Sequence, residues 1–508
     1  MWRDPILTMH EHQPTPAAPE VGPLAARGAL ALGARQIVVW VVNLGSGVVL
    51  ARLLSPADFG VYAIAAFVLS AFTIFGDAGL GASLIRQEQE PTLRDYRSVF
   101  LVQQAIVFGV VVLCWATASL VVSLYGLKES YAWFIRLLAA ALLITSFQTI
   151  SIIRLERCLA FGRLGIISAI ETITFNVTAV AFAAAGAGVY SFGAALLAQA
   201  LVAATLYFVA SPWRIGWQRP TPELRERLAF GIPYQGIGAV SLIKDGISPV
   251  FIGVLLGATQ VGYVKWSQTL AAYTLFAVQV LQRLFMPTFA RLQADPERLR
   301  RAVESVVTAC NAVVAPIALI MIVLARPITH LVYGNKWIPA LPIFYALWCA
   351  NALVPTAAPV MALLNALGAS RLAFLFAVLW MIGTWTLGLP LILAIGALGF
   401  GVANAAIQVT NVILFRVAQR RLSFSITKPA GGPWMLAGAA AAPVLALQLA
   451  WPAQNILSLG AYAATIAGAY ILLVARFGKE YVAFVSRLLG VGLPRFRRAP
   501  EGTSGSLQ

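Results

Sequence analysis

Long apolar runs separated by short polar connections extend over most of the chain. About 20 consecutive apolar residues are enough to cross the hydrocarbon core of a bilayer as an α-helix. Runs of this kind lie near residues 30–50, 59–81, 99–123, 132–153, 164–186, 189–211, 229–256, 260–284, 303–325, 338–364, 372–394, 397–416, 433–450 and 456–475. The pattern therefore predicts an all-α polytopic membrane protein with about fourteen transmembrane helices. Four prolines in the run 338–364 predict a kink or a break there.

Composition and charge agree with this class. Of the 508 residues, 60% are hydrophobic and 11% are charged, whereas a soluble domain carries about 25% charged residues. The 36 lysines and arginines outnumber the 19 aspartates and glutamates. If the N-terminus is cytosolic, most of these basic residues fall on cytosolic segments, as the positive-inside rule requires. The positive charge thus reflects topology, and it predicts two cytosolic termini and no nucleic-acid partner.

The ends of the chain differ from the rest. Residues 1–28 are rich in proline and alanine and lack an apolar run, which predicts a disordered cytosolic tail and not a signal peptide. Residues 478–508 are basic and polar and predict a second cytosolic tail. The four cysteines lie in or beside apolar runs without metal-binding spacing, so we expect free thiols and neither a disulfide nor a metal site.

The two halves of the chain resemble each other. The first match, at an offset of 202 residues, is LLSPADFGVY (53–62) with LLGATQVGYV (255–264). Three more matches share an offset of 208: LYGLKESYA (124–132) with VYGNKWIPA (332–340), Arg163-Leu164 with Arg371-Leu372, and Phe192-Gly193 with Phe400-Gly401. Four matches in one order with a single slip indicate an internal repeat of six helices.

An even number of helices gives both copies of the repeat the same orientation in the membrane. The predicted organisation is an N-terminal bundle (29–211), a cytosolic connection (212–228), a parallel C-terminal bundle (229–418) and two appended helices (432–477). Parallel repeats related by an axis along the membrane normal are typical of transporters that bind substrate near the midplane, between two rocking bundles.

Three segments resemble the polysaccharide-export flippases, bacterial members of the multidrug/oligosaccharidyl-lipid/polysaccharide exporter superfamily. They are VVLARLLSPADFGVYAIAAFVLSAFTIFGDAGLGASLIRQ (48–87), RLFMPTFARLQADPERLRRAVESV (283–306) and HLVYGNKWIPALPIF (330–344). The resemblance implies two six-helix bundles, often with two extra helices. It also implies transfer of undecaprenyl-diphosphate-linked oligosaccharides across the bacterial inner membrane, by alternating access, for surface polysaccharide biosynthesis.

The same resemblance implies the partners. These are the lipid-linked oligosaccharide, the membrane lipids and a polysaccharide polymerase with its export machinery. No cofactor is implied, although coupling to H⁺ or Na⁺ stays open. Two other interpretations stay open as well: a cation-coupled multidrug exporter of the same superfamily, and a flippase for a peptidoglycan lipid precursor. An enzyme is disfavoured, because no Gly-x-x-x-x-Gly-Lys-Ser/Thr loop occurs and the connections between spans are too short for a catalytic domain.

Three cations lie inside predicted spans, where a charge is costly and normally faces a protein interior or a watery cavity. Lys244 lies near the middle of the seventh span, Arg35 near the cytosolic end of the first, and Lys265 about one turn from the outer end of the eighth. Such cations suit a diphosphate, which arginine binds with two parallel hydrogen bonds and lysine as a point charge. Lys244 is the strongest candidate for substrate binding, because Arg35 could also snorkel to the membrane surface.

The seventh span also predicts a polar stripe. Ser241, Asp245 and Ser248 share one helix face, whereas Lys244 and Asp245, as direct neighbours, point about 100° apart. Through the repeat, Asp245 corresponds to Asn43 in the first span. The two equivalent helices are thus expected to present matching polar faces to a central, substrate-binding cavity.

Carboxylates in the spans are candidates for ion coupling or for ion pairs within that cavity. Asp245 is expected to pair with Lys265 or Arg35, or to bind a coupling ion. Glu171 in the fifth span could pair with a loop arginine. Asp77, in the stretch FGDAGLG, lies near the cytosolic end of the second span, where the glycines predict close packing or a bend.

Overall fold

Helices make up all the regular secondary structure in the part of the chain that the structure describes. The computed structural model describes residues 39–77, 79–87, 89–218, 227–229 and 242–477. Each predicted span overlaps a helical segment in these ranges, so the predicted all-α fold is confirmed. Nine helices there are long and apolar enough to cross a membrane, and one bent pair is a tenth candidate. The number fourteen therefore stays a prediction, as do the domain boundaries.

The N-terminal half is an unbroken series of helices, because a chain in lipid must satisfy its peptide groups internally. It consists of the helix Val39–Leu53, α2 (Pro56–Asp77), α3 (Leu80–Arg86), α4 (Leu93–Leu124), α5 (Tyr131–Ser146), α6 (Thr149–Arg157), α7 (Phe161–Ala184) and α8 (Tyr190–Ala210). α5 and α6 together form the bent pair, with 41° between them.

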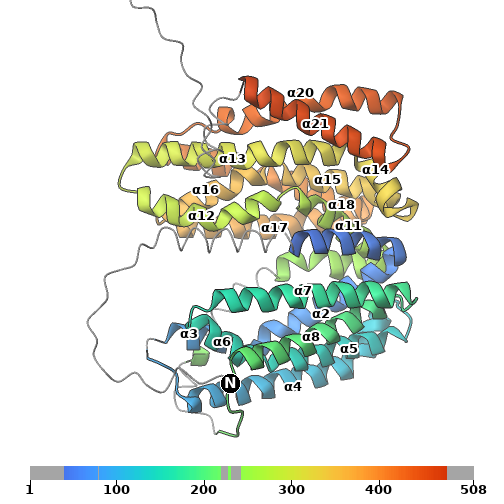
Figure 1. Cartoon of the computed structure of the whole chain (residues 1–508), viewed down its shortest axis with the longest axis vertical. Helices are drawn as coiled ribbons and strands as arrows, with labels where there is room; N and C mark the ends of the chain where they lie inside the picture. Colours follow the sequence, from blue (N-terminus) through green and yellow to red (C-terminus); the bar gives the residue numbers. More distant parts are fainter. Residues whose placement is uncertain (1–38, 78, 88, 219–226, 230–241, 478–508) are drawn as a thin grey trace, which may run out of the picture.

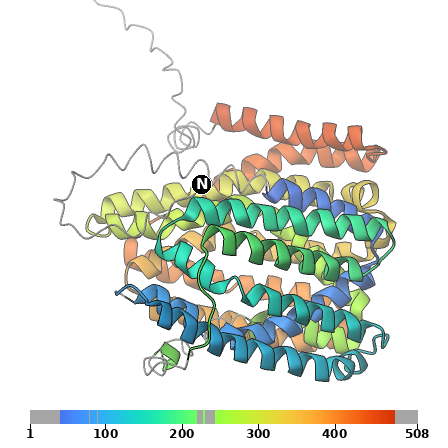
Figure 2. The ribbon, with the colours of Figure 1, turned by 60° about the horizontal axis from the view of Figure 1, so that its bottom comes forward.

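The C-terminal half follows the same plan with more interruptions. It consists of η1 (Ser248–Ile252), α10 (Gly253–Leu256), α11 (Ala258–Tyr273), α12 (Phe276–Leu292), α13 (Pro296–Val323), α14 (Ala325–Ile328), η2 (Thr329–Tyr333), η3 (Asn335–Ala340), α15 (Leu341–Asn351), α16 (Val354–Ala366), α17 (Ser370–Ile395), α18 (Leu398–Gln408) and α19 (Asn411–Leu422). The break between α15 and α16, next to Pro355, confirms the interruption that the prolines predict. Two more helices, α20 (Thr427–Ala450) and α21 (Ile456–Phe477), lie at the edge of the molecule in both views, where α20 packs on α13 (Figures 1 and 2).

The internal repeat is visible in the helix positions. α2 begins at Pro56 and α11 at Ala258, which is the offset of 202 residues, while α8 and α18 begin at Tyr190 and Leu398, which is the offset of 208. The N-terminal half occupies the lower part of the molecule in Figure 1 and the C-terminal half the upper part. The two halves are therefore parallel bundles, as the even number of helices per repeat predicts.

The two ends of the helices have different chemistry. The arginine-rich end carries residues such as Arg94, Arg154 and Arg291. At the other end, which we call the glycine end, the turns contain glycines with positive φ, including Gly126 (φ 59°) and Gly334 (φ 98°). These two glycines are repeat equivalents, and each supplies a left-handed turn after its helix that other residues rarely adopt.

Hydrophobic packing joins the halves towards the glycine end. One core cluster contains buried side chains of both halves, with Ile64 from the first and Val261 and Trp337 from the second. Towards the arginine-rich end, separate clusters form around Phe100 in the N-terminal half and Phe289 in the C-terminal half. The described halves thus share a buried core towards one end and have separate cores towards the other, while Trp40 of the first helix also packs on Tyr273 and Phe276 with ring centroids 5.3 and 4.4 Å apart.

Two glycines allow this fusion. A Cβ on Gly60 of α2 would lie 1.7 Å from the carbonyl oxygen of Ala258, and a Cβ on Gly262 of α11 would lie 1.8 Å from that of Pro56. Gly60 and Gly262 are equivalent positions of the repeat, and so are Pro56 and Ala258. α2 and α11 therefore cross backbone to backbone, in a symmetric contact that any side chain at either glycine would prevent.

Cationic side chains reinforce the closure at the glycine end. Lys336 Nζ donates to the carbonyl oxygens of Arg52 (2.8 Å) and Leu54 (2.6 Å), and the indole N–H of Trp337 donates to the same helix end at 2.9 Å. In return, Arg52 Nε donates to the carbonyl oxygen of Val332 at 2.7 Å. Carbonyls at a helix C-terminus carry partial negative charge, so each half supplies a cation to a helix end of the other.

Gly60→Ala and Gly262→Ala should open the glycine end, since either Cβ must move the two backbones apart by roughly 1.5 Å to reach ordinary contact distance. The reporter is Val261→Cys in a chain whose four native cysteines are replaced. We expect this thiol to resist a membrane-impermeant maleimide in the parent chain and to react in either alanine variant. Gly162→Ala, where a Cβ meets nothing within 4 Å, is the matched control and should stay protected. Protection in all variants would contradict a glycine-dependent closure.

Candidate functional site

The segment that corresponds to the seventh predicted span is not a regular helix. Residues 242–245 are helical, a turn follows at Gly246, and the π-helical turn η1 contains Pro249. Proline removes a backbone donor, and single π-helical turns inside helices are frequent at functional sites. Gly246 lies against α2, where a Cβ would come within 2.9 Å of the Phe67 ring. The backbone of this segment is therefore interrupted where it approaches the other half.

Lys244 and Asp245 form an ion pair at this interruption. Lys244 Nζ lies 2.8 Å from Asp245 Oδ1, and the two side chains are 46% and 68% exposed. The expectation that these neighbours do not face each other is therefore wrong, and within the described residues Asp245 pairs with Lys244 and not with Lys265. Pairing with Arg35 and binding of a coupling ion stay predictions. The expectation assumed a regular helix, whereas here a turn at Gly246 directly follows the pair, and the long lysine side chain bends back to its neighbour. An exposed pair contributes little to stability, and both charges remain accessible to a ligand.

The surrounding contacts place this ion pair relative to the shared core. Ile247, fully buried, belongs to that core and lies against Gly388 of α17. The indole N–H of Trp385, also on α17, donates to the carbonyl oxygen of Ile243 at 3.1 Å. Lys244 and Asp245 thus lie about one turn beyond the shared core, on the side of the arginine-rich end.

The predicted polar stripe stays a prediction, because Ser241 lies outside the described residues, but its other two members differ in burial. Ser248 is 4% exposed and belongs to η1, whereas Asp245 is exposed. Ser248 is the first residue of the π-helical turn and faces the protein interior, whereas Asp245 precedes the turn at Gly246. Ser241 and Arg35 lie outside the described residues. Lys265 is exposed on α11, and Asp77 is the last residue of α2.

Asn43 takes part in a polar cluster between the first described helix and α7. Asn176 Nδ2 donates to Asn43 Oδ1 at 2.8 Å and to the carbonyl oxygen of Thr172 at 2.7 Å. Ser46 Oγ donates to Asn176 Oδ1. Asn176 is 6% exposed, while Asn43 is exposed. The cluster therefore fixes the packing of these two helices and leaves one polar side chain, Asn43, on the surface between them.

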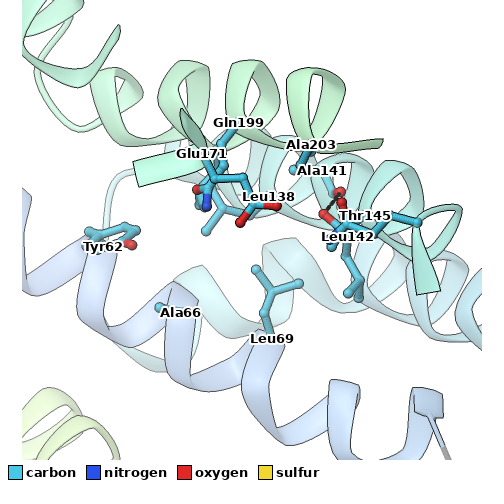
Figure 3. Close-up of a pocket in the computed structure, with 13 residues that line it drawn as sticks. Tyr62, Ala66, Leu69, Leu138, Ala141, Leu142, Thr145, Glu171, Gln199 and Ala203 are labelled. Atoms are coloured by element: carbon cyan, nitrogen blue, oxygen red, sulfur yellow. Dashed lines mark hydrogen bonds between the residues drawn. The ribbon is translucent and has the colours of Figure 1, made fainter. Parts of the chain in front are cut away.

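Glu171 lines a separate cavity inside the N-terminal half. The cavity has a volume of about 300 Å³ and lies among α2, α5, α7 and α8. Figure 3 shows Glu171 beside Gln199, with Tyr62 and Leu69 of α2 on the opposite side. The expected partner of Glu171, a loop arginine, is not what the structure shows: the Tyr207 hydroxyl bonds the carboxylate instead.

Two oxygen atoms at this cavity lack partners in the described part of the chain. They are Glu171 Oε1 and Gln148 Oε1, both buried. Burying an acceptor without a partner is costly, and more so for a carboxylate. A proton, a small cation or water would satisfy these oxygens. The cavity therefore offers two acceptor oxygens to a ligand that donates a hydrogen bond or carries positive charge.

Several of these residues were missed in the sequence. Trp385, Phe67, Gln148 and Gln199 stand in apolar runs where neither periodicity nor charge distinguishes them. Asn176 corresponds through the offset of 208 to Thr384, another small polar residue in an equivalent helix. Comparison of polar positions between the repeats was the one signal that pointed to the Asn43–Asn176 region.

The fold is that of a known class of transporter. The chain superposes on the lipid II flippase MurJ in an inward closed conformation with a TM-score of 0.72, over 89% of this chain and 100% of that one, at 13% sequence identity. It also superposes on a multidrug resistance MATE family transporter of the MOP superfamily, with a TM-score of 0.59 over 78% of this chain and 98% of that one, again at 13% identity. These likenesses show the fold, and the described helices that are long and apolar enough to cross a membrane indicate a multi-pass membrane protein.

The sequence identifies the family. Residues 49–342 match the family described as polysaccharide biosynthesis protein, and the chain belongs to it. Succinoglycan biosynthesis transport protein ExoT of Rhizobium meliloti (strain 1021) is 24% identical over 66% of this chain and 68% of its own length. Lipopolysaccharide biosynthesis protein WzxC of Escherichia coli (strain K12) is 21% identical over 74% of this chain and 78% of its own. The resemblance drawn from the sequence is thereby confirmed.

Asn176→Ala should lower the free energy of unfolding by about 1–2 kcal/mol, because it leaves Asn43 and Ser46 without their shared partner. The measurement is the thermal melting of the purified chain. Asn404→Ala is the matched control, since Asn404 bonds only the carbonyl oxygen of Phe400 one turn away in the described structure. Equal loss of stability in both variants would contradict a cluster between helices.

Proposed function

We propose that the protein is a flippase that moves undecaprenyl-diphosphate-linked oligosaccharides across the bacterial inner membrane for surface polysaccharide biosynthesis. Membership of the polysaccharide biosynthesis family supports this, as do the names of the relatives in succinoglycan transport and lipopolysaccharide biosynthesis. The observation that carries the proposal is the exposed Lys244–Asp245 pair on an interrupted helix, just beyond the core that the two halves share.

A lipid-linked sugar has two parts with opposite needs. Its polyprenyl chain can remain in lipid, while the diphosphate and sugars need a polar route. In this proposal the arginine-rich end is cytosolic, and so are both termini. The head group enters between the halves where their cores are separate, and the diphosphate binds Lys244, with Arg35 and Lys265 as further cations. Asn43 contributes a hydrogen-bonding group to the same route.

Release on the other side requires a change at the glycine end. The contact between Gly60 and Gly262, and the bonds of Lys336 and Arg52, must separate while the arginine-rich end closes. This is alternating access of two parallel repeats. The chain acts as a transporter and not as an enzyme, and a partner polymerase on the outer side removes the product.

Glu171 is the proposed coupling group. Its cavity lies within the N-terminal bundle, among helices that must move with that bundle, and its free oxygen suits a proton or Na⁺. Occupancy of this cavity would change the packing of α2 against α7 and α8, and α2 is the helix that crosses α11. Ion binding and closure at the glycine end are thus linked through one helix.

The transport site is tested by deleting the gene and measuring, leaflet by leaflet, the undecaprenyl-linked oligosaccharides that accumulate. We expect accumulation on the cytosolic face, restored by the wild-type gene. Lys244→Gln should reduce transport about 10-fold or more, the usual cost of one charge-assisted contact. Lys428→Gln, an exposed lysine outside the site, should restore transport fully.

Three results would contradict this assignment. Full transport by Lys244→Gln would remove the lysine from the route. Normal export in the deletion strain with altered drug sensitivity would favour a multidrug exporter. Accumulation of a peptidoglycan lipid precursor in place of oligosaccharides would favour the third interpretation, a peptidoglycan precursor flippase.

Ion coupling is tested with Glu171→Gln, which keeps the shape of the side chain and removes its charge. We expect the purified variant to melt at or above the parent temperature, because an incompletely bonded buried carboxylate is lost. Transport into vesicles should lose its dependence on an imposed H⁺ or Na⁺ gradient. The matched control is Glu156→Gln on α6, which removes a carboxylate outside the cavity. Unchanged gradient dependence in Glu171→Gln would make Glu171 structural.

A further inference from the structure

An apolar groove lies on the membrane face of the N-terminal half, away from the proposed transport route. Its volume is about 750 Å³. α4 forms one wall with Leu101 and Phe108, α5 forms another with Leu143 and Phe147, and Trp217 closes the third side. A volume of this size is within the range of sites for small apolar ligands. Trp217 itself is 86% exposed, so most of its surface lacks cover from the described chain.

The third wall is built by a segment that is firmly held. Residues 211–218 cross the arginine-rich end of α4, where Trp213 packs on Phe100 with ring centroids 5.1 Å apart. Arg154 donates to the carbonyl oxygen of Pro212 at 2.5 Å, and Arg97 Nε donates to that of Arg214 at 2.9 Å. Bonds from α4 and α6 therefore hold the segment up to Arg214, and Trp217 follows three residues later.

Positive charge lies at one mouth of the groove. Arg97 is one turn from Leu101 on the same face of α4, and its guanidinium would lie 2.9 Å from a Cβ on Gly216, the residue before Trp217. Arg94 and Arg214 are exposed at the same end. Asp95, the nearest acid along α4, is already paired with Arg227 at 2.7 Å. The mouth thus presents cations to whatever fills the apolar part.

We propose that the groove binds an anionic phospholipid, with one acyl chain along α4 and α5 and its phosphate on Arg97 and Arg214. An apolar bore with a cationic mouth at the membrane surface matches a lipid with a charged head group. The transported lipid is disfavoured, because α4 lies on the side of the N-terminal half remote from the C-terminal half (Figure 1). This proposal does not depend on the transport function.

The groove lies beside the start of the connection between the two halves, so a bound lipid would affect that connection. Residues 211–218 begin the connection between the two halves, and Arg227, near the end of that connection, is held by Asp95 on the same helix α4. A lipid in the groove covers Trp217 and neutralises the mouth. It therefore stabilises the start of the connection against the N-terminal half.

Photolabelling tests the site with the full chain in phosphatidylethanolamine vesicles. The probe is phosphatidylglycerol that carries a diazirine in one acyl chain, and peptide mass spectrometry locates the label. We expect labelling of residues 100–108 and 143–147, lost when Ala105→Trp fills the groove. Ala116→Trp, at an exposed position of α4 outside the groove, should label like the parent. The pair Arg97→Gln and Arg214→Gln should weaken labelling about 10-fold, whereas Arg291→Gln with Arg371→Gln should not.

Competition separates a specific site from the lipids that surround any membrane protein. Unlabelled phosphatidylglycerol should displace the probe, and phosphatidylcholine should not. Equal labelling of the parent and Ala105→Trp, or equal competition by both lipids, would overturn the proposal. Displacement by undecaprenyl diphosphate at lower concentration than phosphatidylglycerol would also overturn it and would assign the groove to the transported lipid. If Ala105→Trp does not fold, the variant with Arg97→Gln and Arg214→Gln replaces it, and unchanged labelling of that variant would overturn the proposal.

Discussion

The structure depends on one backbone contact, the crossing of α2 and α11 at Gly60 and Gly262. In a membrane the hydrophobic effect does not drive helices together, so their association relies on close packing and on hydrogen bonds. The carbonyl oxygens of Ala258 and Pro56 lie where a Cβ on the opposing glycine would be. Because the two contacts are equivalent in the repeat, the halves meet symmetrically at one end. The shared core and the bonds of Lys336 and Arg52 extend this contact.

The packing at the arginine-rich end differs from the packing at the glycine end. At the arginine-rich end each half has its own core, and its arginines bond to carbonyl groups of the same half, as Arg154 does with Pro212 and Arg157 with the end of α3. Such bonds hold the N-terminal half together at this end without linking it to the C-terminal half, which has its own core around Phe289. Two halves that share a core towards one end are the arrangement from which rocking can occur, since the contacts that must change are few and lie together.

The segment of the seventh predicted span carries the charged residues Lys244 and Asp245 close to the contact between the two halves. A charge inside an apolar run is costly unless it faces protein or water, and Lys244 and Asp245 are both exposed beside the turn at Gly246 and the π-helical turn that follows. Non-helical backbone at membrane depth is tolerated where it lies against protein or water. The same glycine that interrupts the helix lies against Phe67 of α2. The ion pair, the interruption of the helix and a contact between the halves thus lie within a few residues of one another.

The sequence by itself determined the class of protein, the positions of the spans, the repeat and the family. These properties are readable because bilayer thickness fixes the length of an apolar run, and because equivalent segments keep their order. The sequence also singled out Lys244, whose charge in an apolar run is conspicuous without any structure. Tertiary structure decided which side chains meet: that Lys244 pairs with Asp245, that Ser248 is buried, that Glu171 faces a cavity, and that Gly60 meets Ala258. Each of these depends on where a helix is interrupted or on which distant helix packs against it, and no local periodicity records either.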